Sequence, residues 1–373
     1  MIARRALDCA GCSFATTRCA RALNTEIFSR NMDSNPKRIL VVRNAALGDV
    51  LLATAVLPAL TLRYPGRAID FATSFPDVPR SHPLVHRSLR MDEFIATDYE
   101  RIYDLDMSYE LRPNQSILSA FAGSVGCSEA EMRLQYTVGE ADRSTADQLL
   151  RNWGASDQSL VAIQSGTRFW LKNWPAASFT SLVRELEKGF SICFLQLGTA
   201  DDPQVPGTID LRGACSIGVS AALIERSNAF IGLDSALLHF SKAMGKPTAA
   251  IFGNSDPALR VQDGGRDCHI VSSVPCRFCH HRQMPPVVVP VCERQFWVLR
   301  AMDAAANVAL RRHYLAHDRT AMRVARLILS LLRWREKGKR IAPCMDEITV
   351  DRALAQISPW LGSLGVPRRV PPA

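Results

Sequence analysis

Residues 229–253, AFIGLDSALLHFSKAMGKPTAAIFG, contain the pattern of a strand, a helix and a second strand. Residues 229–232 are a short apolar run typical of a buried strand, and residues 236–244 predict a helix that ends at Gly245. Residues 248–252 are a second apolar run. A unit of this kind directs the free N–H groups at the start of its helix toward the carboxyl ends of the strands. The stretch therefore predicts an α/β fold with an edge that binds anions or nucleotides.

Three polar residues would lie around the start of this helix. Asp234 and Ser235 occupy the strand end and the helix cap, and His239 follows Ser235 by four residues, which places it on the same helix face. On these residues alone, a capping pair with a histidine packed in the core explains the pattern as well as a ligand site does.

The alternation of strands and helices occurs in both halves of the chain. Residues 37–42 and 160–164 read as the first strand of each half, and a helix beginning at Asp49 follows the first of them. Residues 82–90 read as a short helix. Two doubly wound α/β domains facing across a cleft account for this repetition. We expect a flexible extension over 1–36, an N-terminal domain over 37–157, a C-terminal domain over 158–290, and a helical basic region with a closing helix over 291–373.

Composition narrows the class of protein and of partner. The chain of 373 residues has a net charge of +9 and no uninterrupted apolar run long enough to span a membrane. Eleven cysteines without a secretory signal indicate free thiols in a reducing cytoplasm. The charge favours an acidic partner, such as a nucleotide, a phosphorylated glycolipid, an anionic membrane surface or nucleic acid. The charge alone does not choose among these partners.

Three separated motifs resemble those of the family 9 glycosyltransferases, the bacterial heptosyltransferase family. They are RNAALGDVLLATAVLPAL (43–60), SGTRFWLKNWP (165–175) and the stretch from Asp234 to Gly253. In that family an Asp-Thr-Gly or Asp-Ser-Gly precedes a helix with a histidine, then a Gly-Lys-Pro turn and a strand ending in Phe-Gly. The resemblance covers residues 38–290. It implies a GT-B-like fold of two Rossmann-like domains that transfers a sugar, with ADP-heptose as the expected donor, to a lipopolysaccharide-type or other glycan acceptor with inversion.

The resemblance also implies roles for individual residues. Asp49 matches the catalytic base, which removes the proton of the acceptor hydroxyl; without the resemblance, Asp49 reads as an aspartate stabilised at a helix start. Lys172, before Trp174-Pro175, would stabilise the departing diphosphate. Asp202 is expected to contact the ribose of the donor nucleotide, and Asp201 is an equal candidate for this role. Ala236 replaces the usual glycine, so the donor's identity stays open. The expected donor-binding residues are Thr167, Arg168, Lys172, Asp202, Cys215, Asp234, Ser235, Ala236 and His239.

Acceptor contacts are expected from arginines of the first half. We expect Arg43, Arg63 and Arg67, with Arg80, Arg87 and Arg112 as further candidates, to meet phosphate or carboxylate, and only one or two of them to matter. Asp104 and Asp106 have the Asp-x-Asp spacing that holds a metal in another glycosyltransferase fold. The resemblance instead implies a reaction that requires no metal and no other cofactor.

The C-terminal region leaves several interpretations open. Cys276, Cys279, Cys292 and Cys344 either hold zinc or are free thiols. The arginine-rich residues 296–339 predict either a helix at the inner membrane surface or a core-packed helix with a basic face. No stripe of interleaved aromatic and basic residues occurs outside this region, which argues against nucleic acid as a partner. Two other functions fit the same motifs: a nucleotide-sugar epimerase on the same fold, and a non-catalytic nucleotide-sugar-binding protein.

Overall fold

The computed structural model describes residues 38–262, 264–281 and 341–369, with the isolated positions 305, 309, 320, 323, 324 and 327. The chain divides into a unit of residues 1–37 and a unit of residues 38–373, and all described residues belong to the second unit. The predicted extension over 1–36, Cys292 and nearly all of the arginine-rich region 296–339 lie outside the described residues.

Two parallel sheets carry the described part of the chain. The first has the strand order β3-β2-β1-β4 and the second the order β10-β9-β8-β5-β6-β7. Their strands are β1 (Arg38–Val42), β2 (Ile69–Ala72), β3 (Arg87–Leu89), β4 (Tyr99–Asp104), β5 (Leu160–Ile163), β6 (Cys193–Gln196), β7 (Ile209–Asp210), β8 (Ala229–Leu233), β9 (Thr248–Phe252) and β10 (Cys268–Val271). β8 and β9 are buried throughout, as strands covered by helices on both faces must be.

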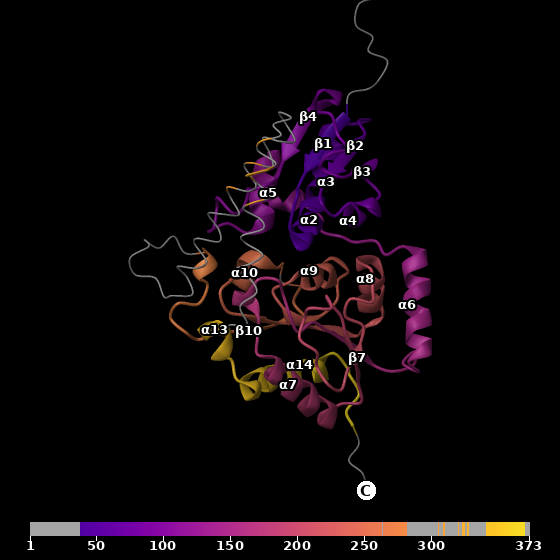
Figure 1. Ribbon diagram of the computed structural model, residues 1–373, viewed down its shortest axis with the longest axis vertical. Coiled ribbons are helices and arrows are strands. Elements are labelled where there is room, and N and C mark those ends of the chain that lie inside the picture. The colour runs from indigo at the N-terminus through magenta and orange to yellow at the C-terminus, as the bar shows by residue number, and fades with distance from the viewer. Residues whose placement is uncertain are drawn as a thin grey trace, which may run out of the picture. The chain divides into compact units, whose positions relative to one another are not determined.

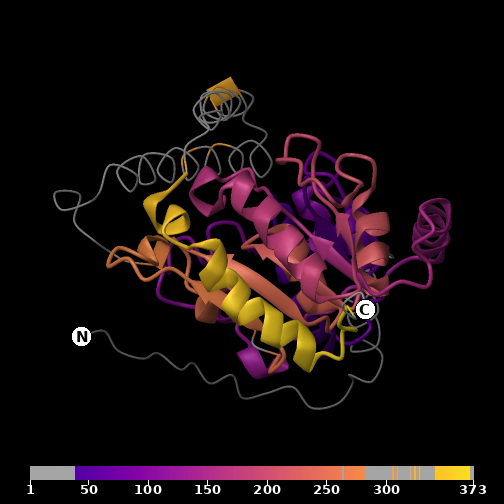
Figure 2. The same cartoon turned by 90° about the horizontal axis from the view of Figure 1, so that it is seen from below.

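Helices flank both sheets (Figure 1). Their bounds are α2 (Leu47–Ala53), α3 (Leu57–Arg63), α4 (Asp77–Arg80), α5 (Ile117–Val125), α6 (Glu140–Asn152), α7 (Ala176–Gly189), α8 (Ile217–Arg226), α9 (Ala236–Ala243), α10 (Pro257–Arg260), α13 (Pro343–Asp346) and α14 (Val350–Ser363). The closing helix α14, yellow in Figure 2, packs along α7. None of the described helices is long and apolar enough to cross a bilayer.

The two sheets are joined through their helices. α2, after β1, packs against α9, after β8, and α6 packs against α8. Between α6 and α8, Nε of Arg143 lies 2.7 Å from Oε2 of Glu225. One buried apolar cluster includes Leu51 of α2 and Phe240 of α9, so the two halves share part of their core. The first turns of α2 and α9 meet, with Gly48 beside Ala236.

The structure agrees with most of the predicted elements and corrects one. The strand, helix and strand predicted within residues 229–253 are confirmed as β8, α9 and β9. The helix predicted over 82–90 is wrong, because this segment contains β3, which pairs with β2. The buried carboxylate of Asp70 in β2 accepts hydrogen bonds from Arg87 and lies 3.1 Å from Nδ1 of His86. This contact favours the extended conformation over a helix.

Candidate active site

Asp49 lies in the first turn of α2, directly beyond the carboxyl end of β1. Its Oδ2 accepts hydrogen bonds from the backbone N–H of Ala46, from Nη2 of Arg43 (2.9 Å) and from the hydroxyl of Tyr109 (2.9 Å). Burial would raise the pKa of Asp49, but the charges of Arg43 and Arg260 outweigh burial and lower it. The carboxylate is therefore ionised at neutral pH, and Oδ1 takes part in none of these three hydrogen bonds.

Arg43, the residue after β1, holds the carboxylate of Asp49 by a hydrogen bond. The residue is 2% exposed, and its guanidinium donates to Oε1 of Glu110 (2.7 Å) and to the carbonyl of Leu105 (3.0 Å) as well as to Asp49. Burial lowers the pKa of Arg43, yet Glu110 and Asp49 raise it well above the usual value. Arg43 thus fixes the carboxylate of Asp49, and its burial does not support the predicted contact with an acceptor.

Asp234 is the centre of a second charged cluster, at the carboxyl end of β8. Its Oδ2 lies 2.8 Å from Nζ of Lys172 and accepts a hydrogen bond of 2.7 Å from Ser255, while Nε2 of His239 lies 3.8 Å from Oδ1. Burial would raise the pKa of Asp234, but Lys172 and Arg260 lower it far below its usual range. Burial lowers the pKa of His239, so its imidazole is neutral at neutral pH.

The Asp49 and Asp234 clusters meet where α2 contacts α9. A Cβ atom added to Gly48 would lie 2.9 Å from Cδ2 of His239 and 3.2 Å from Cα of Ala236. A residue without a side chain therefore permits this approach. The base candidate and the predicted donor site lie at one junction between the two sheets.

The other predicted donor residues lie in loops at the carboxyl edge of the second sheet. Ser235 caps α9, and its hydroxyl donates to Oε1 of Gln164 (2.5 Å). Thr167 is held by Asn173, whose Oδ1 accepts the Thr167 N–H (2.8 Å) and hydroxyl (2.9 Å). Gln164 and Asn173 were not predicted, because an amide side chain gives no signal in a sequence until its partner is known.

Asp202 is buried within its own turn. Its carboxylate accepts the N–H (3.0 Å) and hydroxyl of Thr199, and a Cβ added to Gly166 would lie 2.8 Å from its Oδ1. Burial raises the pKa of Asp202. The alternative, Asp201, is exposed, as is Arg168, and Cys215 is half-buried just before the cap of α8.

Arg63 and Arg67 lie away from Asp49. Arg63 ends α3 and donates to the carbonyls of Val125 and Gly126, whereas Nε of Arg67, just before β2, lies 3.3 Å from Glu100. A helix after a parallel strand runs back to the amino edge of the sheet, so the end of α3 lies opposite the carboxyl edge that carries Asp49. The structure therefore gives no support to Arg63 or Arg67 as acceptor contacts.

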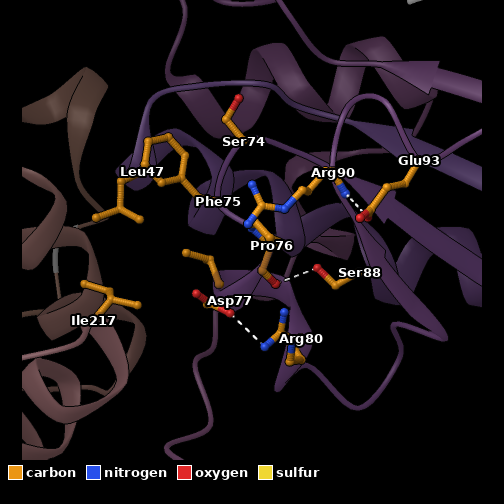
Figure 3. A pocket seen from close by; sticks show the side chains of 11 residues that line it. Leu47, Ser74, Phe75, Pro76, Asp77, Arg80, Ser88, Arg90, Glu93 and Ile217 are labelled. Atoms are coloured by element: carbon orange, nitrogen blue, oxygen red, sulfur yellow. Dashed lines mark hydrogen bonds and ion pairs between the residues drawn. The ribbon is translucent and has the colours of Figure 1, made fainter.

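A cavity of about 370 Å³ lies at the carboxyl edge of the first sheet (Figure 3). Leu47, two residues before Asp49, forms part of its wall, and Ile217 of α8 forms another part. Arg80, one of the further acceptor candidates, and Arg90, which was not predicted, also line it. In Figure 3 the guanidinium of Arg90 points toward Phe75 and Pro76. Two carboxylates line the cavity as well: Asp77 lies 2.8 Å from Arg80, and Glu93 accepts the backbone N–H of Arg90.

The sequence suggested two metal sites. Oδ1 of Asp104 accepts the N–H of Asp106, and Oδ1 of Asp106 accepts the N–H of Asn44, both at 2.9 Å. Within the described residues, no group of three or more His, Cys, Asp or Glu side chains is arranged to hold a metal ion. Cys276, Cys279 and Cys344 are not in disulfides, and Cys292 lies outside the described residues.

Comparison with known proteins gives consistent matches. Residues 113–285 match the model of glycosyltransferase family 9 (heptosyltransferase). Lipopolysaccharide heptosyltransferase 1 of Pseudomonas aeruginosa is 22% identical over an alignment of 305 residues, which covers 65% of this chain and 86% of that protein. Lipopolysaccharide heptosyltransferase 3 of Escherichia coli is 29% identical over 110 residues, covering 26% of this chain and 32% of that protein.

Solved structures agree in fold. A family 9 glycosyltransferase from Veillonella parvula superposes with a TM-score of 0.54 at 17% identity, covering 73% of this chain and 98% of that one. An iron-containing dodecameric glycosyltransferase from enterotoxigenic E. coli gives 0.52 at 14% identity, covering 81% and 77%. The two parallel sheets with their helices form the GT-B fold of these enzymes. The match over residues 113–285 places this part of the chain with glycosyltransferase family 9, the heptosyltransferase family, and the chain is a glycosyltransferase.

Proposed function

We propose that this enzyme transfers heptose from ADP-heptose to a hydroxyl of a lipopolysaccharide-type or other glycan acceptor, with inversion at the anomeric carbon. The two curated relatives described above are lipopolysaccharide heptosyltransferases, which supports this substrate class. One observation carries the proposal. The Asp49 cluster and the Asp234 and Lys172 cluster meet where Gly48 contacts His239, so a base and a cation face one junction.

The reaction assigned to this junction is a single displacement. Oδ1 of Asp49 takes the proton of the acceptor hydroxyl, and the oxygen of that hydroxyl attacks the anomeric carbon from the face opposite the diphosphate. The bond from this carbon to the diphosphate oxygen breaks, and its electron pair leaves on ADP. Lys172 and the N–H groups at the start of α9 stabilise the negative charge on the leaving diphosphate. Asp49 afterwards releases its proton to solvent.

We assign the acceptor to the cavity beside Leu47. Arg80, which pairs with Asp77 at 2.8 Å, and Arg90 line this cavity, and an arginine binds phosphate or carboxylate with two parallel hydrogen bonds. An anionic group held there would leave a neighbouring hydroxyl on the same edge of the first sheet as Asp49. This assignment replaces Arg63 and Arg67, whose side chains bind Gly126 and Glu100.

The release of ADP from ADP-heptose, measured with and without a truncated lipopolysaccharide acceptor, tests the reaction. Acceptor-dependent release is expected, and Asp49→Asn should lower kcat by about 10²- to 10⁴-fold because the proton acceptor is lost. Asp157→Asn is the matched control, since Asp157 is exposed in the segment before β5. Activity of Asp49→Asn close to that of the unmodified enzyme would refute the assigned base.

The donor site is tested by calorimetric titration with ADP, GDP and UDP. Selective binding of ADP is expected, and Lys172→Ala should weaken it by roughly tenfold or more, because a charge-assisted hydrogen bond contributes about 1.5 to 3 kcal/mol. Lys188→Ala is the control, since the side chain of Lys188 is 65% exposed and pairs only with Glu185 among the described residues. Equal binding by the Lys172→Ala variant would overturn the donor site.

The same assays distinguish the two rival functions. An epimerase would convert the nucleotide sugar without acceptor and without releasing ADP. A binding protein would bind ADP-heptose and release nothing, and Asp49→Asn would leave its affinity unchanged. Either pattern would replace the transferase proposal.

We propose that transfer needs no metal ion at the reacting atoms, because Lys172, Arg260 and Arg43 already supply positive charge around Asp49 and Asp234. Undiminished transfer after dialysis against a chelator is expected, and a loss restored by added metal would contradict it. Elemental analysis of the same samples also tests the cysteines, since one solved neighbour is described as iron-containing. Bound zinc or iron would indicate that the cysteines hold a structural metal. Thiols that titrate in a sample without bound metal would indicate that the cysteines are reduced.

A further inference from the structure

Tyr109 lies between two buried arginines that come from different sheets. Its ring centroid is 5.2 Å from Cζ of Arg43, at the end of β1, and 5.1 Å from Cζ of Arg260, the last residue of α10. The two arginines are 2% and 6% exposed. Guanidinium groups within about 6 Å of a ring centroid are attracted to the ring, and more strongly where water is excluded. The aromatic ring therefore links the first half of the enzyme to the second.

Tyr109 extends this link to the base. Its hydroxyl donates to Oδ2 of Asp49, the oxygen that also accepts from Nη2 of Arg43, each at 2.9 Å. Arg43 is shared by two carboxylates, because its Nη2 also lies 2.7 Å from Oε1 of Glu110. Arg260 is less fully paired: its Nε has no hydrogen-bond partner among the described residues and lies 4.0 Å from Oδ2 of Asp234.

The charged and titratable groups facing Asp49 come from four places. They are Arg43 after β1, Tyr109 in the turns after β4, His239 of α9 and Arg260 of α10, together with the N–H of Ala46. Behind them, Glu110 and Asp106 face Arg43, and Lys172 and Asp234 face His239 and Arg260. Burial disfavours the charge of Arg260, but Tyr109, Asp234 and Asp49 keep it protonated. Arg260 is thus the cation that α10 contributes to the surroundings of the base.

We propose that Tyr109 and Arg260 are positioning residues for Asp49: Tyr109 orients the carboxylate, and Arg260 holds Tyr109 in place and keeps Asp49 ionised from the opposite half. The proposal rests on the role of Asp49 as base. Its consequence is that the base is complete only when α10 lies against the turns after β4. The donor-binding half of the enzyme therefore controls the base in the other half.

The pH profile of kcat/KM measures the effect of Arg260 on Asp49 directly, because its acid limb reports the ionisation of the essential base in the free enzyme. The positive charge of Arg260 lowers the pKa of Asp49, so its removal must raise that pKa. We expect the acid limb of Arg260→Met to move to higher pH and kcat to fall by about 10- to 100-fold from misplacement of the carboxylate. Arg260→Lys, which keeps the charge, should return the limb toward its original position.

Tyr109→Phe tests the same link with the loss of one oxygen atom, and it serves if Arg260→Met does not fold. It should also move the acid limb upward, because Asp49 loses a donated hydrogen bond. Arg266→Met is the control, since Arg266 is exposed in the same half and donates to the carbonyl of Gly245. Neither its pH profile nor its kcat should change.

A readout without substrate is the pH dependence of unfolding. A carboxylate whose pKa is lowered on folding stabilises the native state above its unfolded pKa of about 3.9, and this stabilisation is lost as pH falls through the folded pKa. The stability difference between the unmodified enzyme and Arg260→Met should therefore shrink toward acid pH. The difference should shrink less when Asp49→Asn is also present, because only the effect of Arg260 on the pKa of Asp234 then remains.

The possible failures are distinct. If Asp49→Asn stays active, the base assignment fails whatever Arg260 does. If Asp49→Asn is inactive but Arg260→Met and Tyr109→Phe keep the original acid limb, the inference alone fails. A tenfold loss of ADP affinity in Arg260→Met with an unchanged limb would likewise overturn it, and would make Arg260 a donor ligand.

Discussion

Carboxylates that share one guanidinium have opposite ionisation behaviour in this enzyme. Asp49 and Asp106 both face Arg43, but Nη2 of Arg43 lies 2.9 Å from Asp49, whereas Nε lies 3.9 Å from Asp106. Burial raises the pKa of Asp106 to about 7, because the attraction of Arg43 does not offset it and Asp104 adds repulsion. One arginine therefore keeps Asp49 ionised beside a second carboxyl group that holds its proton at mildly acid pH.

This raised pKa predicts a pH-dependent gain from Asp106→Asn. Between about pH 4 and the folded pKa, the native state binds more protons than the unfolded state, so stability falls as pH rises. Asp106→Asn does not lose stability in this way, and its amide oxygen can still accept the N–H of Asn44. Its free energy of unfolding in urea, relative to the unmodified enzyme, should rise from pH 5 to pH 8.5 by about 3 kcal/mol at most. Asp157→Asn should show no such trend, and a flat difference for Asp106→Asn would refute the raised pKa.

At the scale of elements, the contact between α2 and α9 brings the site together. Each helix follows a central strand of its sheet, β1 or β8, so each first turn lies at a carboxyl edge. The absence of a side chain at Gly48 lets the backbone of α2 approach Ala236 and His239. The spacing of these two helices sets the distance from Asp49 to the loop that carries Asp234.

Gly48→Ala is therefore expected to reduce kcat about 10-fold or more, although alanine favours a helix. The added methyl group would force α2 and α9 apart, and overpacking of this kind costs about 1 to 3 kcal/mol. Gly189→Ala in α7 is the matched control: nothing lies within 4 Å of its added Cβ atom, so stability should stay equal or rise by up to about 1 kcal/mol. Steady-state kinetics and urea unfolding measure both effects, and equal behaviour of the two variants would contradict this account.

At the scale of the whole molecule, the net charge of +9 bears on where the enzyme meets its acceptor. The described surface contributes Arg80 and Arg90 at the cavity, and the sequence places many further arginines between residues 296 and 339. A glycolipid acceptor is presented at an anionic membrane surface, which a basic protein approaches by electrostatic attraction. We propose peripheral association with the inner, cytoplasmic face of the membrane.

Sedimentation with lipid vesicles tests this association. Binding to phosphatidylglycerol vesicles is expected at about 0.1 M salt and should be largely lost at about 1 M, where the screening length falls from about 10 Å to about 3 Å. Phosphatidylcholine vesicles, which are neutral, are the control. Equal binding to both lipids, or binding that high salt does not reduce, would indicate an apolar mode of association instead.

The sequence determined the parts of this protein that depend on neighbouring residues. The apolar runs, the cap at Ser235 and the stop at Gly245 predicted β8, α9 and β9 to within about two residues, because strand and helix periodicity are local properties. The position of Asp49 at a helix start was also readable. The helix predicted over 82–90 failed because pairing of β3 with β2, a non-local contact, overrode local preference.

Only the tertiary structure decided which distant side chains share the site. Arg43, Tyr109 and Arg260 come from separate elements, and nothing in the spacing of 43, 109 and 260 predicts that two guanidinium groups enclose one ring. The amino-edge positions of Arg63 and Arg67 likewise follow from the direction in which α3 returns along its sheet. Such contacts depend on how α2, α9 and α10 pack, which is fixed by the shared core of the two halves and leaves no local signal in the chain.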